Sequence, residues 1–363
     1  MRLTLLVIAA LACACTPPRT SAAPASASDL LERARELHRS MITVDTHDDI
    51  PLNFATPEVD PLNADRQVNL EKMRAGGLDA GFFIVYVGQT PRTAENYEQA
   101  RADAMRKFAA IHRMADTLYP HLIELAYSPA DVRRINRSGK LVAAIGIENG
   151  YVIGRDLSLI APYFALGARY MTLAHGRNND ICDSSTDPAP EHNGLSAFGR
   201  DAVREMNRVG MMVDISHVSK QCMLQATALS TSPVIASHSS TKALADVPRN
   251  MDDEQLRAVA ANGGVAHMVA LVRFVKTTPP RATVADFVDH IDHAVRVAGI
   301  NHVGISSDFD GGGGVVGWED ASQTWNVTVE LLRRGYSDDE IRKLWGENLL
   351  RVWEENRRRA TAR

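Results

Sequence analysis

Short apolar segments alternate with amphipathic segments along most of this chain. Eight of the apolar segments have the length of β-strands, and several are apolar throughout, which is typical of strands buried on both faces. They occupy residues 41–46, 79–87, 141–148, 168–175, 211–217, 233–238, 263–271 and 302–308. Strands that alternate with helices predict a parallel sheet. Eight such units predict an α/β fold of the (β/α)8 TIM-type barrel class.

An open, doubly wound sheet is the alternative architecture. No Gly-x-Gly-x-x-Gly motif follows a first strand, so a dinucleotide-binding fold has no support. The glycine run at residues 311–314 lacks the Lys and Ser/Thr of a phosphate loop and predicts a flexible rim. Because no linker-like stretch follows residue 28, we expect residues 28–363 to form one barrel domain.

Residues 1–27 have the pattern of an export signal, with a positive start, a short apolar core and small residues afterwards. The apolar core at 3–14 is too short to span a bilayer as a stable helix. Cleavage near 21–25 would release a periplasmic or extracellular protein. Acylation of Cys13 or Cys15 would instead give a membrane-anchored lipoprotein, although no leucine stands three residues before either cysteine.

Composition and charge narrow the function classes further. Of the 363 residues, 45% are hydrophobic and 23% are charged, which is ordinary for a globular protein. The formal net charge is -4 and no basic run occurs, so a nucleic-acid partner has no support. Cys182 and Cys222 would pair in an oxidising compartment or remain two unrelated thiols.

Polar side chains stand at the ends of six of the eight predicted strands. They are His47 and Asp49 on the first strand, Glu148 on the third, His175, His217 and His238 on the fourth to sixth, and Asp308 on the eighth. The C-terminal ends of barrel strands are where barrel enzymes place their chemistry. We therefore expect these side chains to form one site.

Imidazoles and carboxylates are ligands for zinc and related divalent ions. The set is too large for one catalytic zinc with an open position, and it suits two metal ions bridged by a carboxylate. Glu148 stands alone on its strand between the two groups of residues and is the natural bridge. Asp308, on the last strand, is placed to take or pass a proton.

With these residues in place, the chain resembles the membrane (renal) dipeptidases, zinc enzymes of peptidase family M19 in the amidohydrolase superfamily. One matching stretch reads Val-Asp-Thr-His-Asp-Asp-Ile-Pro, and another reads Gly-Ile-Ser-Ser-Asp-Phe-Asp-Gly. The matching stretches are residues 44–51, 146–150, 170–175, 193–219, 236–239, 249–253, 304–311 and 346–352.

The resemblance implies a cofactor of two Zn²⁺ ions and a role for each metal ligand. His47 and Asp49 would hold one zinc, His217 and His238 the second, and Glu148 would bridge the pair. The resemblance also implies that a metal-bridging hydroxide attacks the peptide carbonyl of the substrate.

Three further residues take substrate roles by the same resemblance. His175 would polarise the scissile carbonyl or stabilise the oxyanion, and Arg249 would bind the terminal carboxylate of the substrate. Asp308 would engage the free amine and shuttle the proton. The chain departs from the family pattern at Asp48, where Asn is frequent, and at Met251, where the animal enzymes have Val-Pro.

The implied activity is the hydrolysis of free dipeptides, including dipeptides with a D-residue at the carboxyl end. One alternative is a related amidohydrolase that cleaves N-acyl amino acids. Another is a non-catalytic lipoprotein that binds peptides or metal. Small dipeptides are the expected partners, and a symmetric homodimer is the default expectation for the oligomeric state.

Overall fold

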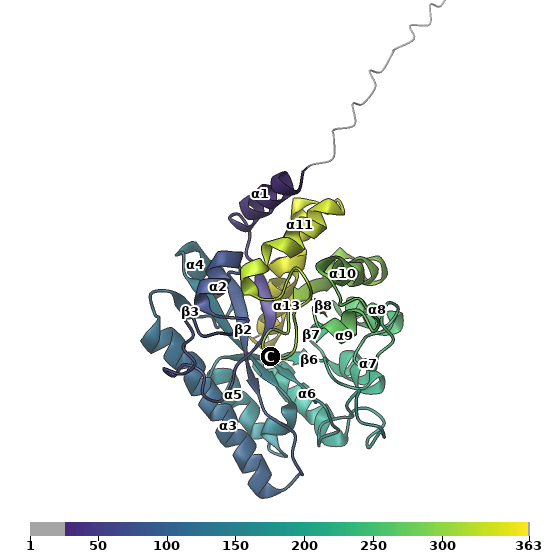
Figure 1. The fold of residues 1–363 in the computed structure, drawn as a ribbon. Helices are drawn as coiled ribbons and strands as arrows, with labels where there is room; N and C mark the ends of the chain where they lie inside the picture. Colours follow the sequence, from purple (N-terminus) through teal and green to yellow (C-terminus); the bar gives the residue numbers. More distant parts are fainter. Residues whose placement is uncertain (1–25, 362–363) are drawn as a thin grey trace, which may run out of the picture.

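The computed structural model describes residues 26–361 and forms a nearly closed barrel of parallel strands with helices around it (Figure 1). The sheet order is β1-β2-β4-β5-β6-β7-β8-β9, and a short strand, β3, pairs with β4 outside this path. The strands are β1 (Val44–Asp49), β2 (Ala80–Tyr86), β3 (Ile123–Leu125), β4 (Leu141–Glu148), β5 (Ala168–Thr172), β6 (Met212–Asp214), β7 (Ile235–Ser239), β8 (Val265–Val269) and β9 (Val303–Ser306). The predicted (β/α)8 barrel class is confirmed.

The first and last strands approach each other and nearly close the barrel. The backbone N–H of Asp49 donates to the carbonyl of Phe309 at 3.0 Å. The N–H of Ser307 donates to a carboxylate oxygen of Asp45, also at 3.0 Å. The polar ends of β1 and β9 therefore lie side by side, although they are far apart in the sequence.

Helices surround the strands, and each long helix after a strand begins at a polar residue. Thr93, Ser196 and Ser219 are examples, because each side chain accepts a hydrogen bond from a backbone N–H of the first turn. The helices are α1 (Ala27–His38), α2 (Leu70–Gly76), α3 (Ala94–His112), α4 (Pro129–Arg137), α5 (Ile160–Ala165), α6 (Ala197–Val209), α7 (Lys220–Leu229), α8 (Asp253–Asn262), α9 (Val272–Val275), α10 (Val284–Ala298), α11 (Trp325–Arg333), α12 (Asp338–Arg342) and α13 (Asn348–Thr361).

The barrel interior is filled by side chains and closed at one end by α13. Phe82 of β2 lies with its ring centroid 5.3 Å from that of Tyr170 on β5 and 5.8 Å from that of Trp353 on α13. All three are fully buried. The same apolar cluster includes Val44 and Val142, which lie at the N-terminal ends of their strands. The opposite, C-terminal end is thus the one left for polar chemistry.

Several strands end earlier than the sequence pattern predicts. The strands expected to reach His175, His217 and Asp308 end two or three residues sooner. The backbone φ angle is 67° at His217 and 59° at Asp308, in the left-handed region that strands cannot use. The first strand, predicted at 41–46, instead spans β1 and includes both polar residues. These residues are therefore presented by turns as well as by strands.

Other differences concern short elements and the N-terminus. The pattern did not predict α2, β3 or α9, each of seven residues or fewer. The first helix begins at Ala27 after a cap by Ser26. The predicted export signal, including Cys13 and Cys15, lies outside the described residues except for its last two positions. Within residues 26–361, no helix has both the length and the apolar character that a bilayer-spanning helix requires.

Candidate metal centre and active site

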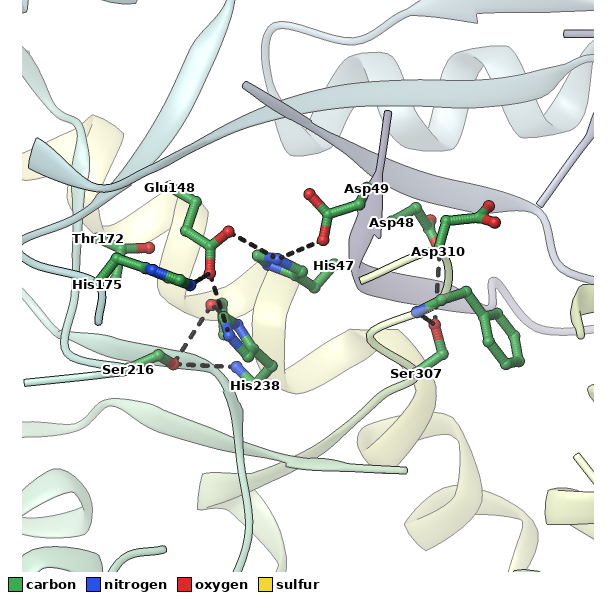
Figure 2. A network of polar contacts seen from close by, with 12 residues as sticks. His47, Asp48, Asp49, Glu148, Thr172, His175, Ser216, His238, Ser307 and Asp310 are labelled. Atoms are coloured by element: carbon green, nitrogen blue, oxygen red, sulfur yellow. Dashed lines mark hydrogen bonds and ion pairs between the residues drawn. The ribbon is translucent and has the colours of Figure 1, made fainter. Parts of the chain in front are cut away.

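Glu148, the last residue of β4, lies at the centre of the predicted ligands (Figure 2). Its Oε2 atom is 3.6 Å from Nε2 of His47. Its Oε1 atom is 3.0 Å from Nε2 of His217 and 3.4 Å from Nε2 of His238. The two carboxylate oxygens thus face two different groups of imidazoles, as a bridging carboxylate would.

His47 and Asp49 lie two residues apart on β1 and converge on the same place. The Nε2 atom of His47 is 3.6 Å from Oδ2 of Asp49. The hydroxyl of Tyr170 donates to the carbonyl of Thr46 at 2.8 Å, and its oxygen lies 3.1 Å from Nδ1 of His47. That oxygen therefore accepts the Nδ1 proton, which leaves a lone pair on Nε2 aimed at Glu148.

The Nε2 atom of His47 is buried and has no hydrogen-bond partner among the described residues. A buried nitrogen without a partner is costly unless it binds something else. A lone pair that lies between the carboxylates of Asp49 and Glu148 fits a divalent cation. The surroundings of the His47 Nε2 atom therefore support a metal site at this position.

His217 and His238 form the second imidazole group, and their Nε2 atoms are 2.7 Å apart. The hydroxyl of Ser237 donates to Oδ2 of Asp214 at 2.6 Å and lies 2.8 Å from Nδ1 of His238. The Nδ1 proton of His238 is thus held by Ser237, and its Nε2 carries the lone pair. Burial lowers the pKa of both histidines well below the ordinary value, which favours neutral, ligand-competent rings.

Asp214, at the end of β6, fixes the turn that carries His217 and the strand β7 that carries His238. Its carboxylate accepts hydrogen bonds from the backbone N–H of Ser216 at 3.0 Å and of Ser237 at 2.9 Å. It also accepts from the hydroxyl of Thr172 on β5 at 2.5 Å. One buried carboxylate therefore ties the ends of three neighbouring strands together.

Charge interactions within the cluster are strong. Burial opposes ionisation of Glu148, but His47 and His175 outweigh it and hold the pKa of Glu148 well below its ordinary value. Burial likewise opposes a charged His47, but Glu148 and Asp49 raise the pKa of His47 well above its ordinary value. The same carboxylates that attract this proton would attract a metal cation in its place.

His175 and Asp308 also belong to the cluster. The Nε2 atom of His175 lies 3.7 Å from Oε1 of Glu148. The ligand atoms that Asp308, His47 and His238 offer lie within 4.8 Å of one another. Burial raises the pKa of Asp308 well above the ordinary value, with further contributions from Asp49 and Glu148 against that of His47. All seven residues predicted at strand ends are thus brought together.

The glycine run after β9 packs against this cluster. A Cβ atom on Gly311 would lie 2.2 Å from Oδ2 of Asp49 and 2.5 Å from Oδ1 of Asp308. A Cβ atom on Gly313 would lie 1.9 Å from the carbonyl oxygen of Ser307. The sequence predicted a flexible rim here, whereas the structure gives these two glycines close packing contacts.

Arg249 is buried beside the second imidazole group with donors to spare. Its Nη2 donates to the carbonyl of His238 at 3.0 Å, and its Nη1 to Oγ of Ser239 at 3.4 Å. Its Nε is buried and has no partner among the described residues. Its guanidinium carbon lies 5.2 Å from the centroid of the Phe274 ring. Burial lowers the pKa of Arg249 to about 10, so the group stays cationic at neutral pH and suits an anionic substrate group.

A cavity of about 430 Å³ opens beside the cluster. Its walls combine three predicted site residues with three that the sequence pattern did not single out. They are Asp49, Glu148 and His175, together with Arg66, Tyr86 and Lys107. Arg66 lies in a loop and Lys107 on a helix. Neither stands at the end of a predicted strand, so the strand-end pattern did not identify them.

Asp48, at which the chain departs from the family pattern, lies against the neighbouring strand. Asp48 is buried, and a Cβ on Gly81 would lie 2.5 Å from its Oδ2, so its carboxyl packs against β2. Burial and Asp45 raise the pKa of Asp48 well above its ordinary value.

The thiols of Cys182 and Cys222 are buried and in contact with each other, and both are free. Of the two states that the sequence left open, the structure has the free thiols.

Comparison with known proteins gives a consistent result. A family model described as membrane dipeptidase (peptidase family M19) matches residues 31–363. Dipeptidase tcpJ of Claviceps purpurea is 39% identical over 294 residues, which cover 79% of this chain and 69% of the relative.

Solved structures agree with the sequence relatives. A probable dipeptidase, PvdM from Pseudomonas aeruginosa, superposes with a TM-score of 0.88 at 30% identity and covers 92% of this chain and all of the other (100%). A metallo peptidase from Rhodobacter sphaeroides, liganded with a phosphinate mimic of the dipeptide L-Ala-D-Ala, has a TM-score of 0.79 at 25% identity. It covers 87% of this chain and 99% of the other.

Proposed function

This chain belongs to the membrane dipeptidase family, peptidase family M19, and is a metal-dependent dipeptidase; from that premise we propose how its own residues bind and cleave the substrate. The proposal is zinc-dependent hydrolysis of free dipeptides, L,D-dipeptides included. The observation that carries it is the convergence of four imidazoles and two further carboxylates, those of Asp49 and Asp308, around Glu148.

We propose that His47 and Asp49 would hold one zinc ion, that His217 and His238 would hold the other, and that Glu148 would be shared between them. The unpartnered Nε2 of His47 and the adjacent Nε2 atoms of His217 and His238 support this assignment. When bound, a zinc pair would polarise a carbonyl and lower the pKa of a water to about 7, which makes hydroxide available as the nucleophile.

The remaining residues would act on the substrate directly. Arg249 would bind the terminal carboxylate through its spare donors. Asp308 would pair with the free ammonium of the substrate and carry a proton to the leaving amine. A raised pKa suits that role, because the group must hold a proton during part of the cycle. His175 would hydrogen-bond the carbonyl oxygen as negative charge develops there.

Acceptance of L,D-dipeptides is supported by one structural relative. The Rhodobacter sphaeroides metallo peptidase is liganded with a mimic of L-Ala-D-Ala. The similarity covers 87% of this chain at 25% identity. We therefore include dipeptides with a D-residue at the carboxyl end among the substrates of this chain.

A small substrate panel tests the proposal. We would measure hydrolysis of L-Ala-L-Ala, L-Ala-D-Ala and their N-acetyl forms, with zinc present, after chelation and after zinc is restored. We expect zinc-dependent cleavage of the free dipeptides alone, because N-acetylation removes the ammonium that Asp308 would bind. Cleavage of only the acetylated forms would favour an N-acyl amino acid hydrolase, and no cleavage of any form would favour a binding protein.

Export, lipid anchoring and dimerisation are proposals that rest on the sequence alone. Incorporation of labelled palmitate that is lost in Cys13→Ser or Cys15→Ser would support the lipoprotein form, whereas a cleaved, unlabelled product would support simple secretion. Light scattering of the purified chain would decide between a monomer and the homodimer that we infer.

A further inference from the structure

Lys107, on α3, lines the cavity beside the proposed metal ligands. The residue is 5% exposed, and its Nζ lies 5.5 Å from the centroid of the Tyr86 ring. Among residues 26–361, no oxygen lies within hydrogen-bonding or ion-pairing distance of this ammonium. The aromatic ring offers a weak cation–π contact, which replaces only part of the lost hydration.

The charged side chains near Lys107 interact with other partners. Burial lowers the pKa of the Lys107 ammonium, and the more distant charges of Asp49 and Glu148 offset this effect only in part. Under the proposed function, both carboxylates bind metal. Arg66, the other cation of this cavity, donates to the carbonyl of Asp49 at 2.8 Å and lies 3.3 Å from Oδ2 of Asp310. Lys107 is therefore a nearly buried cation that forms no direct ion pair with a residue among 26–361.

The position of the cavity indicates which part of a dipeptide would enter it. Arg249 lies beside His238, while the cavity is bordered by Asp49, Glu148 and His175. If the terminal carboxylate of the substrate binds Arg249, the carboxyl-terminal residue of the substrate lies near His238. The amino-terminal residue then faces the cavity that contains Lys107.

We propose that Lys107 binds an acidic side chain on the amino-terminal residue of the substrate, so that the preferred dipeptides begin with glutamate or aspartate. This inference rests on the proposed dipeptidase function and names its substrate class. Arg66 adds positive charge to the same cavity but is held by Asp49 and Asp310. A lysine ammonium on a flexible stem can follow a carboxylate of either length.

The test compares the zinc-loaded wild type with Lys107→Met and Lys107→Arg on four dipeptides: L-Glu-L-Ala, L-Gln-L-Ala, L-Ala-L-Glu and L-Ala-L-Gln. We expect the wild type to favour L-Glu-L-Ala over L-Gln-L-Ala by about tenfold or more in kcat/KM. Lys107→Met should lose this preference mainly through a higher KM for L-Glu-L-Ala. Lys107→Arg should keep most of it.

A matched control removes a lysine elsewhere. Lys140→Met takes away the same charge near the N-terminal end of β4, where Lys140 pairs with Glu124 at 3.2 Å, and should leave the preference unchanged. The inference is overturned if the wild type treats L-Glu-L-Ala and L-Gln-L-Ala alike, or if Lys107→Met weakens both equally. A preference confined to L-Ala-L-Glu also overturns it. If the wild type cleaves none of the four dipeptides, the proposed function is overturned, and this inference with it.

Discussion

The Nε2 atoms of His217 and His238 lie 2.7 Å apart, and both face the same oxygen of Glu148. Two neutral imidazoles with lone pairs at that distance repel each other unless a proton or a cation is shared between them. Burial lowers the pKa of both rings, so neither ring readily takes up a second proton. The pair is therefore arranged for a metal ion, and its two histidines come from the ends of different strands.

Metal removal should abolish activity and lower stability together. The cluster is buried and its carboxylates repel one another without cations, so chelation should lower the Tm and zinc should restore it. His238→Ala should reduce the bound zinc from about two ions per chain to about one, measured by elemental analysis. His121→Ala, an exposed histidine outside the cluster, is the control. Full metal content in His238→Ala would contradict the ligand assignment.

Arg249→Lys should weaken substrate binding while the metal site stays intact. A lysine lacks the planar fork that holds a carboxylate through two parallel hydrogen bonds. We expect KM for L-Ala-L-Ala to rise by about 10- to 100-fold, with a smaller change in kcat. Arg273→Lys provides the control, because Arg273 is exposed and stacks on the same Phe274 ring at 5.4 Å. Equal KM values in both variants would exclude a carboxylate-binding role.

Gly311→Ala should damage the site although it adds only one methyl group. The new Cβ would collide with the carboxylates of Asp49 and Asp308, at 2.2 and 2.5 Å. Displacing these groups by about 1 Å should lower kcat/KM by about 100-fold. Gly176→Ala is the matched change, since nothing lies within 4 Å of a Cβ there. Near-normal activity in Gly311→Ala would show that the carboxylates can move without cost.

His38 should make stability depend on pH at a place remote from the metal ligands. Burial lowers the pKa of His38 from 6.5 to about 4, and its ring lies 2.7 Å from Oγ1 of Thr328 and 3.0 Å from the carbonyl of Gly77. The folded state thus binds fewer protons than the unfolded state between these values. The stabilisation is fully present above pH 6.5 and is lost as pH falls toward about 4.

Urea unfolding at about pH 7.5 and about pH 4.5, with chelator in every sample, would measure this effect. Between the two pH values, the wild type should lose about 2–3 kcal/mol more unfolding free energy than His38→Gln. The glutamine amide in that variant can still bond both neighbours but does not titrate. His121→Gln should behave like the wild type. Parallel losses in wild type and His38→Gln would show that other groups set the pH dependence.

The local pattern of the chain was enough to predict the barrel and the residues at its polar edge. Apolar runs of strand length, separated by amphipathic segments, bury a sheet on both faces in only a few ways. Because parallel strands bring their C-terminal ends to one edge, polar residues after successive strands had to meet there. His47, Glu148 and His238 were identified on that basis, without any knowledge of their contacts.

The tertiary structure decided which other groups support or border the site. Tyr170 holds the tautomer of His47, yet it is one more residue in a strand when the sequence is read alone. Asp214 is a polar residue within a predicted strand, but only the folded chain shows that its carboxylate joins three strand ends. Lys107 looks like a solvated helix residue until α3 packs beside β2. The left-handed turns at His217 and Asp308 were likewise invisible.

The physical reason for this division is the range of the interactions. Strands and their polar ends follow from the periodicity of neighbouring residues, which one sequence displays directly. The hydrogen bond between Tyr170 and His47 spans 123 positions, and the cavity that contains Lys107 exists only once several such segments have packed together. The sequence by itself thus determined the barrel and the polar residues at its C-terminal edge, and the packing decided the orientation of these residues and the cavity beside them.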